Sequence, residues 1–165
     1  MKKTCFTVIL CTLLLPNIAI AHQDYLVFSA GSYDVLRQDE RTLEGRAEYR
    51  KDIDFFIKPL FGGLISGKRA VYGYIGAYHA FYWHNFFLTP SFAVGLYNRG
   101  NGKDLNYPIE FKSQIELGYE FHNHYRLSAG FSHLSNASLS HTRNKSNPGA
   151  ESAFISLHIP FNYFH

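Results

Sequence analysis

Segment 109–121 alternates apolar and polar side chains along its whole length, and this pattern constrains the fold more than any other feature of the sequence. Its odd positions are Ile109, Phe111, Ser113, Ile115, Leu117, Tyr119 and Phe121, and its even positions are Glu110, Lys112, Gln114, Glu116, Gly118 and Glu120. Successive side chains of a β-strand point to opposite faces, so a period of two predicts a strand with one apolar and one charged face. Segments 43–50 and 125–132 alternate in the same way. The chain is therefore predicted to be all-β.

The lengths of these segments favour a membrane barrel over a soluble sandwich, whose strands would also alternate. Strands of about ten residues or more cross a bilayer at a tilt. Tyr119, Phe121 and Tyr125 also place aromatic rings at strand ends, as in the girdles of outer-membrane barrels. The polar faces would line a narrow interior that charged side chains fill. The residues predicted to neutralise one another there are Glu44, Arg46, Glu48, Arg50, Glu110, Lys112, Glu116, Glu120 and Arg126.

Eight segments carry strand signals, and an even number permits an antiparallel up-and-down transmembrane β-barrel with both termini on the periplasmic side. The predicted strands are 24–34, 43–50, 56–64, 70–82, 86–97, 109–121, 125–136 and 151–163. The connections at 51–55, 84–85 and 122–124 are short, whereas those at 98–108 and 137–150 are long. Short periplasmic turns and longer outer loops are typical of outer-membrane barrels.

Residues 1–21 have the composition of a signal peptide. Lys2 and Lys3 precede an apolar run, and Ala19-Ile20-Ala21 fits the small-x-small cleavage pattern. The predicted barrel domain is therefore 22–165. Both cysteines lie in the signal segment, which excludes disulfides and thiolate chemistry from the barrel domain. Removal of Lys2 and Lys3 lowers the formal net charge from +3 to +1, so charge gives no reason to expect nucleic-acid binding.

Three polar residues near the last predicted hairpin share one face. His133 and Ser135 continue the odd, lipid-facing positions of their strand, because residues two apart point the same way. Glu151 begins the odd, lipid-facing positions of the next strand. The loop assignment places this end at the outer leaflet. A site that faces outward there meets a membrane lipid, which in a Gram-negative outer leaflet is lipopolysaccharide.

These residue types supply the parts of a hydrolytic triad. Ser135 would attack an ester carbonyl, His133 would take its proton, and Glu151 would orient the imidazole. The side-chain amide of Asn136 would help to stabilise the oxyanion. Taken singly, a His-x-Ser pair on a strand is more often polar surface, and Asn136 is more often a turn former. The shared face is what favours catalysis. No metal or cofactor is expected, because His79, His122, His124 and His158 form no ligand-like cluster.

Two motifs resemble the signature of the PagL family of lipid A 3-O-deacylases: His133-x-Ser135-Asn136-Ala137 and Asn147-Pro148-Gly149-x-Glu151. Segments 88–95 and 109–121 resemble the family's fifth and sixth strands. The resemblance implies an eight-stranded outer-membrane barrel that removes the ester-linked acyl chain at position 3 of lipid A without a metal. It assigns Ser135 as nucleophile, His133 as base, Glu151 as third member and Asn136 to the oxyanion hole. The loop 138–146 is longer than in the family pattern, which bears on substrate fit.

The predicted partners are lipid A, or lipopolysaccharide, and the bacterial outer membrane, with no nucleic acid; a homodimer is left open. Phosphorylated lipid A suits basic side chains, and the predicted outer connections contain Arg37, Arg41, Lys68, Arg69, Arg99, Lys103, Arg143 and Lys145. Two alternatives remain. One is a non-enzymatic structural or adhesive barrel, and the other is a phospholipase or acyltransferase with the same triad.

Overall fold

The computed structural model describes residues 23–36, 40–139 and 149–161, so the predicted signal peptide lies outside the described part of the chain. The strands are β1 (Asp24–Tyr33), β2 (Thr42–Arg50), β3 (Lys58–Ser66), β4 (Val71–Tyr78), β5 (Phe81–Trp83), β6 (Phe86–Asn98), β7 (Ile109–Glu120), β8 (Arg126–Ser135) and β9 (Ala150–Phe161). None of the described residues form a helix long and apolar enough to cross a membrane.

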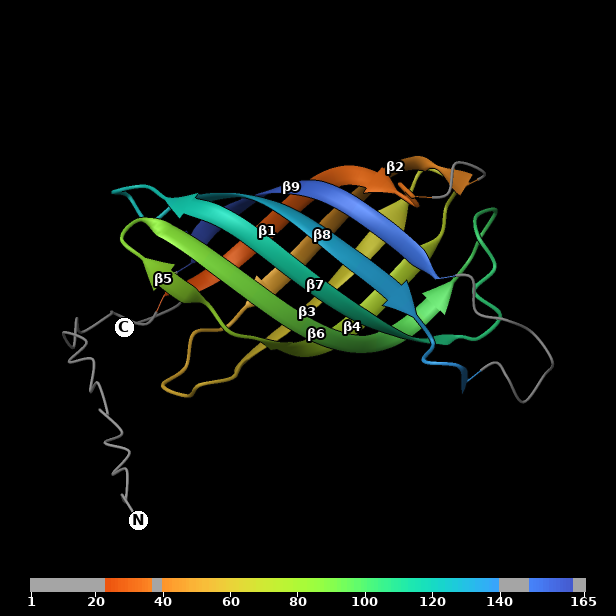
Figure 1. Ribbon diagram of the computed structural model, residues 1–165, viewed down its shortest axis with the longest axis horizontal. Coiled ribbons are helices and arrows are strands. Elements are labelled where there is room, and N and C mark those ends of the chain that lie inside the picture. The colour runs from red at the N-terminus through yellow and green to blue at the C-terminus, as the bar shows by residue number, and fades with distance from the viewer. Residues whose placement is uncertain (1–22, 37–39, 140–148, 162–165) are drawn as a thin grey trace, which may run out of the picture.

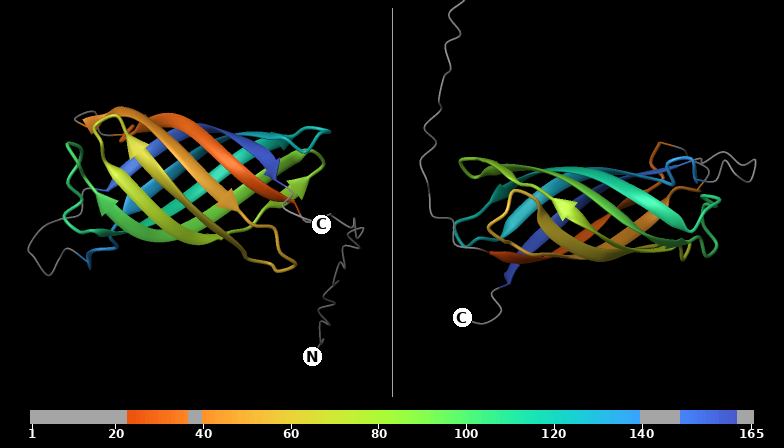
Figure 2. Two further views of the ribbon diagram at one scale, coloured as in Figure 1. Left: turned by 180° about the vertical axis from the view of Figure 1, so that it is seen from behind. Right: turned by 90° about the horizontal axis from the view of Figure 1, so that it is seen from below.

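The strands close into a single antiparallel barrel (Figures 1 and 2). Their order is β4-β3-β2-β1-β9-β8-β7-β6-β5, and an additional β4–β6 pairing closes the ring. The predicted eight-stranded fold is confirmed, with β4 and β5 together taking the place of the predicted strand 70–82. The division has a simple cause. Lys58 begins β3 and pairs with Tyr78, so β5 lies beyond the end of β3 and pairs only with β6.

Charged residues fill the barrel interior, as the alternation predicted. Arg46 donates to Glu44 from Nε at 2.8 Å, and Arg50 forms ion pairs with Glu48 and Glu116. These side chains are almost completely buried. Further interior pairs join Lys112 to Glu48 and Arg126 to Glu120. A buried charge requires a partner of opposite sign or several hydrogen bonds, and this network supplies both.

The third strand begins two residues later than predicted. The apolar run of Phe55, Phe56 and Ile57 was assigned in part to the strand 56–64, but β3 starts at Lys58 and these three side chains are exposed in the β2–β3 connection. The Phe56 ring stacks on the imidazole of His79, with ring centroids 4.1 Å apart. These apolar side chains lie on the outer surface of the barrel, at a turn. A short apolar run in the sequence does not by itself distinguish such a turn from a strand.

The two ends of the barrel differ. Asp24 and Phe161 are paired in register, so the first and last strands meet at one end, here called the terminal end. The connection 99–108, the end of β8 at Ser135 and the start of β9 at Ala150 lie at the opposite end, here called the loop end (Figure 1). Exposed aromatic side chains gather at the terminal end: Phe55, Phe56, Phe81, Trp83, Phe86, Phe121 and Tyr125.

Candidate active site

His133 and Glu151 lie side by side on the outer surface at the loop end. They are cross-strand partners in the β8–β9 ladder, and 3.1 Å separates His133 Nδ1 from Glu151 Oε1. The His133 side chain is 46% exposed and that of Glu151 13%. On either side of His133, Ser132 and Leu134 are buried in the interior. The odd positions of β8 therefore face outward here, toward the surrounding lipid.

Ser135 follows on the same face of β8 and is half-buried. It pairs in register with Phe111 of β7, whereas the β8–β9 ladder ends one residue earlier, at Leu134 and Ala150. Because Nδ1 of His133 faces the carboxylate of Glu151, Nε2 is the nitrogen left to exchange a proton with a hydroxyl group. This is the orientation that a triad histidine needs.

Ser113 of β7 is a second outward-facing serine beside His133. It is exposed and is the cross-strand partner of His133 on the side opposite Glu151. Directly opposite residues on antiparallel strands have Cβ atoms about 4.5–5.5 Å apart. Ser113 belongs to the apolar face of segment 109–121, but it lies 20 residues from His133 along the chain, and no local pattern in the sequence indicates that the two meet. A test of the nucleophile must therefore compare Ser135 with Ser113.

Gly149 packs against the imidazole of His133. Its φ is +61°, in the left-handed region that favours glycine. A Cβ added at this position would lie 2.9 Å from Cε1 of His133, which is closer than carbon atoms ordinarily approach. Any other L-residue at 149 would therefore push the ring aside. The sequence motif that resembles the family contains Gly149, but only the structure shows that the absence of a side chain there leaves room for the His133 ring.

Asn136 does not share the outward face of His133 and Ser135. Its side chain is fully buried, and its Nδ2 donates a hydrogen bond to the Leu105 carbonyl oxygen at 2.8 Å. Leu105 belongs to the β6–β7 connection and is itself buried. The structure thus brings His133, Ser135 and Glu151 to one face and turns the Asn136 amide toward the barrel interior.

The interior contains another serine, histidine and glutamate in mutual contact. Ser128 Oγ lies 2.8 Å from Glu116 Oε2 and 3.0 Å from His158 Nε2. His158 and Glu116 are each 1% exposed, and Glu116 also pairs with Arg50. No ester can reach a sealed site of this kind, so burial separates this structural cluster from the surface group around His133.

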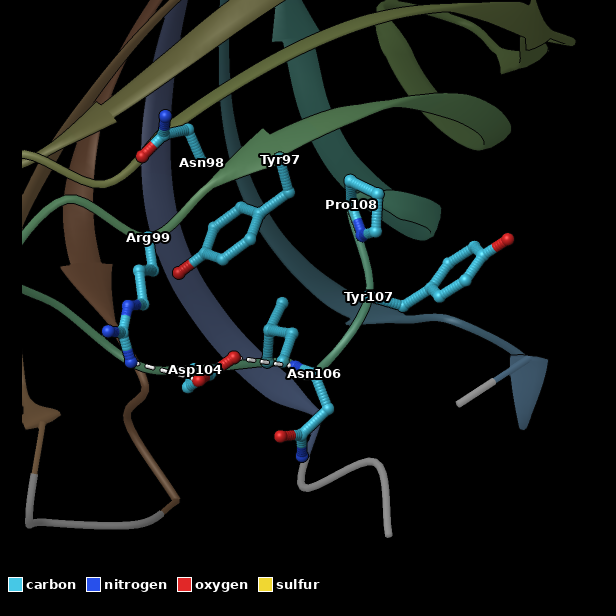
Figure 3. Close-up of a pocket in the computed structure, with 8 residues that line it drawn as sticks. Tyr97, Asn98, Arg99, Asp104, Asn106, Tyr107 and Pro108 are labelled. Carbon is cyan, nitrogen blue, oxygen red and sulfur yellow. Dashed lines mark hydrogen bonds and ion pairs between the residues drawn. The ribbon is translucent and has the colours of Figure 1, made fainter. Parts of the chain in front are cut away.

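A pocket of about 280 Å³ lies in the β6–β7 connection at the loop end. Figure 3 shows Arg99 and Asp104 paired at one side of it, with Tyr107 directed away from them. None of the three triad candidates lines this pocket. Among the described residues, no group of three or more histidine, cysteine, aspartate or glutamate side chains is placed to hold a metal ion.

The basic residues of the loop end are arranged differently from the prediction. Lys103 is buried and forms an ion pair with Asp34 at 2.6 Å, so it is not placed to meet a lipid phosphate. Lys68 pairs with Glu40, and Arg99 pairs with Asp104. The predictions for Arg37, Arg143 and Lys145 fall outside the described residues.

A closed antiparallel barrel with an apolar outer face defines a transmembrane β-barrel, and His133, Ser135 and Glu151 face outward together at its loop end. The sequence pattern of the lipid A 3-O-deacylase (PagL) family matches residues 41–160. The chain therefore belongs to the PagL family of lipid A 3-O-deacylases, which are β-barrels of the bacterial outer membrane.

Solved structures support the fold. The crystal structure of the outer membrane enzyme PagL has a TM-score of 0.66 and 17% identity, covering 84% of this chain and 99% of that one. A de novo designed transmembrane β-barrel has a TM-score of 0.58 and 7% sequence identity, and the match covers 83% of this chain and 95% of that one. The crystal structure of Neisserial surface protein A has a TM-score of 0.56 and 12% sequence identity, and the match covers 84% of this chain and 97% of that one. Comparison with curated proteins gave no significant match. One fold can carry unrelated functions, so the family assignment depends on the sequence match.

Proposed function

We propose that the protein is an outer-membrane serine esterase that removes the ester-linked 3-hydroxyacyl chain at position 3 of lipid A. The observation that carries this proposal is the outward-facing contact of 3.1 Å between His133 Nδ1 and Glu151 Oε1, with Ser135 two residues along the same face of β8. In a membrane barrel, an outward-facing site is reached by lipids. The family match indicates which lipid.

The proposed reaction uses Ser135 as nucleophile. Ser135 Oγ attacks the ester carbonyl carbon and passes its proton to His133 Nε2. The ester C–O bond then breaks, and His133 returns the proton to the 3-oxygen of lipid A, which leaves as a hydroxyl group. Water attacks the acylated serine by the same proton route and releases the 3-hydroxy fatty acid. Glu151 holds the ring through Nδ1 and stabilises the imidazolium that forms.

Asn136 is the proposed source of oxyanion stabilisation, adjacent to the nucleophile in sequence. Hydrogen-bond donors directed at a developing oxyanion commonly contribute a factor of about 10²–10³ to the rate. Because one Nδ2 hydrogen of Asn136 bonds to the Leu105 carbonyl oxygen, this role requires the second Nδ2 hydrogen to face the oxyanion. An Asn136→Ala variant that keeps full activity would exclude it.

The proposed orientation places the loop end, and with it the triad, at the outer leaflet, where lipid A is found. It is supported by the connection lengths, since the turn between β5 and β6 at the terminal end is short and the connection between β6 and β7 at the loop end is long, and outer-membrane barrels have short periplasmic turns and longer outer loops. A signal peptide of residues 1–21 would direct the chain to this membrane. A homodimer remains a prediction, which the mass of the purified protein in detergent would check.

Mass spectrometry of lipid A from cells that express the protein tests the proposal. We expect loss of one 3-hydroxyacyl chain, abolished by Ser135→Ala and retained in Ser113→Ala, the matched outward-facing serine. If only Ser113→Ala abolishes the loss, the nucleophile has been assigned wrongly. Hydrolysed phospholipid with intact lipid A would instead indicate a phospholipase, and unchanged lipids around a correctly inserted barrel would indicate a non-enzymatic role.

A further inference from the structure

Two contacts cross the barrel at the loop end, between opposite walls. In the closed ring of strands, β1 and β6 are four steps apart in either direction, with β4 and β5 counted as one strand. The Tyr33 hydroxyl of β1 nevertheless lies 3.0 Å from the Tyr97 hydroxyl of β6. Asp34 directly follows β1, and its Oδ1 accepts a hydrogen bond of 2.6 Å from Nζ of Lys103 in the β6–β7 connection. The loop end is thus closed by side chains that join opposite sides of the sheet.

The Asp34–Lys103 pair is buried and specific. Asp34 is fully buried and Lys103 is 9% exposed. Within the described residues, the second carboxylate oxygen of Asp34 has no hydrogen-bond partner, so Lys103 is the main compensation for its charge. The Lys103 carbonyl accepts a hydrogen bond from the Tyr97 hydroxyl at 2.8 Å, which ties the connection 99–108 to the end of β6.

Asp34 and Lys103 are each close in sequence to a residue that contacts the proposed site. The backbone N–H of Val35, the residue after Asp34, donates to the Glu151 carbonyl oxygen at 2.9 Å. The carbonyl of Leu105, two residues after Lys103, accepts from Asn136 Nδ2 at 2.8 Å. A continuous set of contacts therefore runs from Glu151 across the mouth to Asn136, the neighbour of Ser135.

The β8–β9 ladder does not fix this geometry by itself. It ends at Leu134 and Ala150, so no β9 residue is paired with Ser135. Glu151 and His133 are held by the ladder, but the position of Ser135 relative to them depends on β7 and on whatever anchors Asn136. Catalysis is sensitive to such placement, since an error of about 1 Å can lower a rate about 10²-fold.

We propose that Asp34 and Lys103 are positioning residues for the hydrolytic site. Their buried ion pair closes a brace across the barrel mouth, which runs through Val35 to Glu151 and through Leu105 and Asn136 to Ser135. The inference rests on the proposed function, because it concerns the placement of the proposed nucleophile.

The test compares two double variants of the full-length protein in vesicles that contain lipopolysaccharide. Asp34→Asn with Lys103→Met removes the brace without leaving a buried charge. Asp52→Asn with Lys58→Met removes another largely buried ion pair, at the terminal end and away from the triad. We expect the first variant to lower kcat about 10- to 100-fold with KM changed less than about twofold, because the lipid-binding surface is untouched. The control keeps both parameters. Lys103→Arg, which retains the ion pair, should recover most of kcat.

A folded Asp34→Asn/Lys103→Met barrel with the kcat of the wild type would overturn the proposal, and so would equal losses in both double variants. If that double variant does not fold, Asp34→Asn with Lys103→Gln replaces it, since it removes both charges of the ion pair but keeps polar side chains at both positions; full kcat in this variant would equally overturn the brace. Failure of the proposed function is separate, because wild-type protein would then release no fatty acid.

Discussion

Replacement of Gly149 by alanine should impair catalysis far more than folding. The new Cβ would lie 2.9 Å from His133 Cε1, whereas carbon atoms pack at about 3.5–4.0 Å. The imidazole must therefore move by at least about 0.6 Å, a displacement for which rate losses approach 10²-fold. The φ of +61° adds a conformational cost of about 1–2 kcal/mol for a non-glycine residue. We expect kcat to fall on the order of 10²-fold while most of the folding stability remains.

Two further variants separate the collision from the backbone strain. Asn tolerates a positive φ better than alanine does, so Gly149→Asn should be more stable than Gly149→Ala but equally impaired in kcat. Gly45→Ala is the control, because a Cβ at Gly45 would meet nothing within 4 Å. The assays are fatty-acid release from lipopolysaccharide vesicles and urea unfolding followed by the fluorescence of Trp83, the single tryptophan, at the terminal end. Wild-type kcat in a folded Gly149→Ala protein would refute the reasoning.

Two other predictions follow from the same contacts. Glu151→Gln keeps the size of the side chain but loses its charge, so kcat should fall about 10³–10⁴-fold, as the analogous change does in serine-protease triads; unchanged kcat in vesicle assays would mean that Glu151 does not orient His133. Glu116→Leu removes a buried partner of Arg50 and should lower the free energy of unfolding by about 3–5 kcal/mol without changing kcat, as urea unfolding and the same vesicle assay would show. An unchanged unfolding midpoint would contradict the structural role of the interior network.

The sequence by itself determined the barrel and the directions of its faces. Alternation at 43–50 and 109–121 required one apolar and one charged face, and a charged face in a narrow barrel must neutralise itself. The same period placed His133, Ser135 and Glu151 on the outer surface, where the structure has them. These features could be predicted because the period of a strand is a local property of the backbone.

The sequence determined strand boundaries less well, because the same apolar run can belong to a strand or to an exposed turn. The run of Phe55 to Ile57 is equally compatible with a strand and with a lipid-facing turn, and only the pairing of Lys58 with Tyr78 shows where β3 begins. The division between β4 and β5 has the same origin, since it depends on where a neighbouring strand ends.

Only the tertiary structure decided which distant residues surround the site. The pairing of Ser113 with His133 depends on the β7–β8 register, and the closeness of Gly149 to the imidazole depends on the path of the chain into β9. Lys103 is a charged loop residue in the sequence, yet closure of the barrel buries it against Asp34 from the opposite wall. Contacts across a closed barrel join residues whose separation in sequence carries no periodic signal, so local patterns predict which way a side chain faces but not what it meets there.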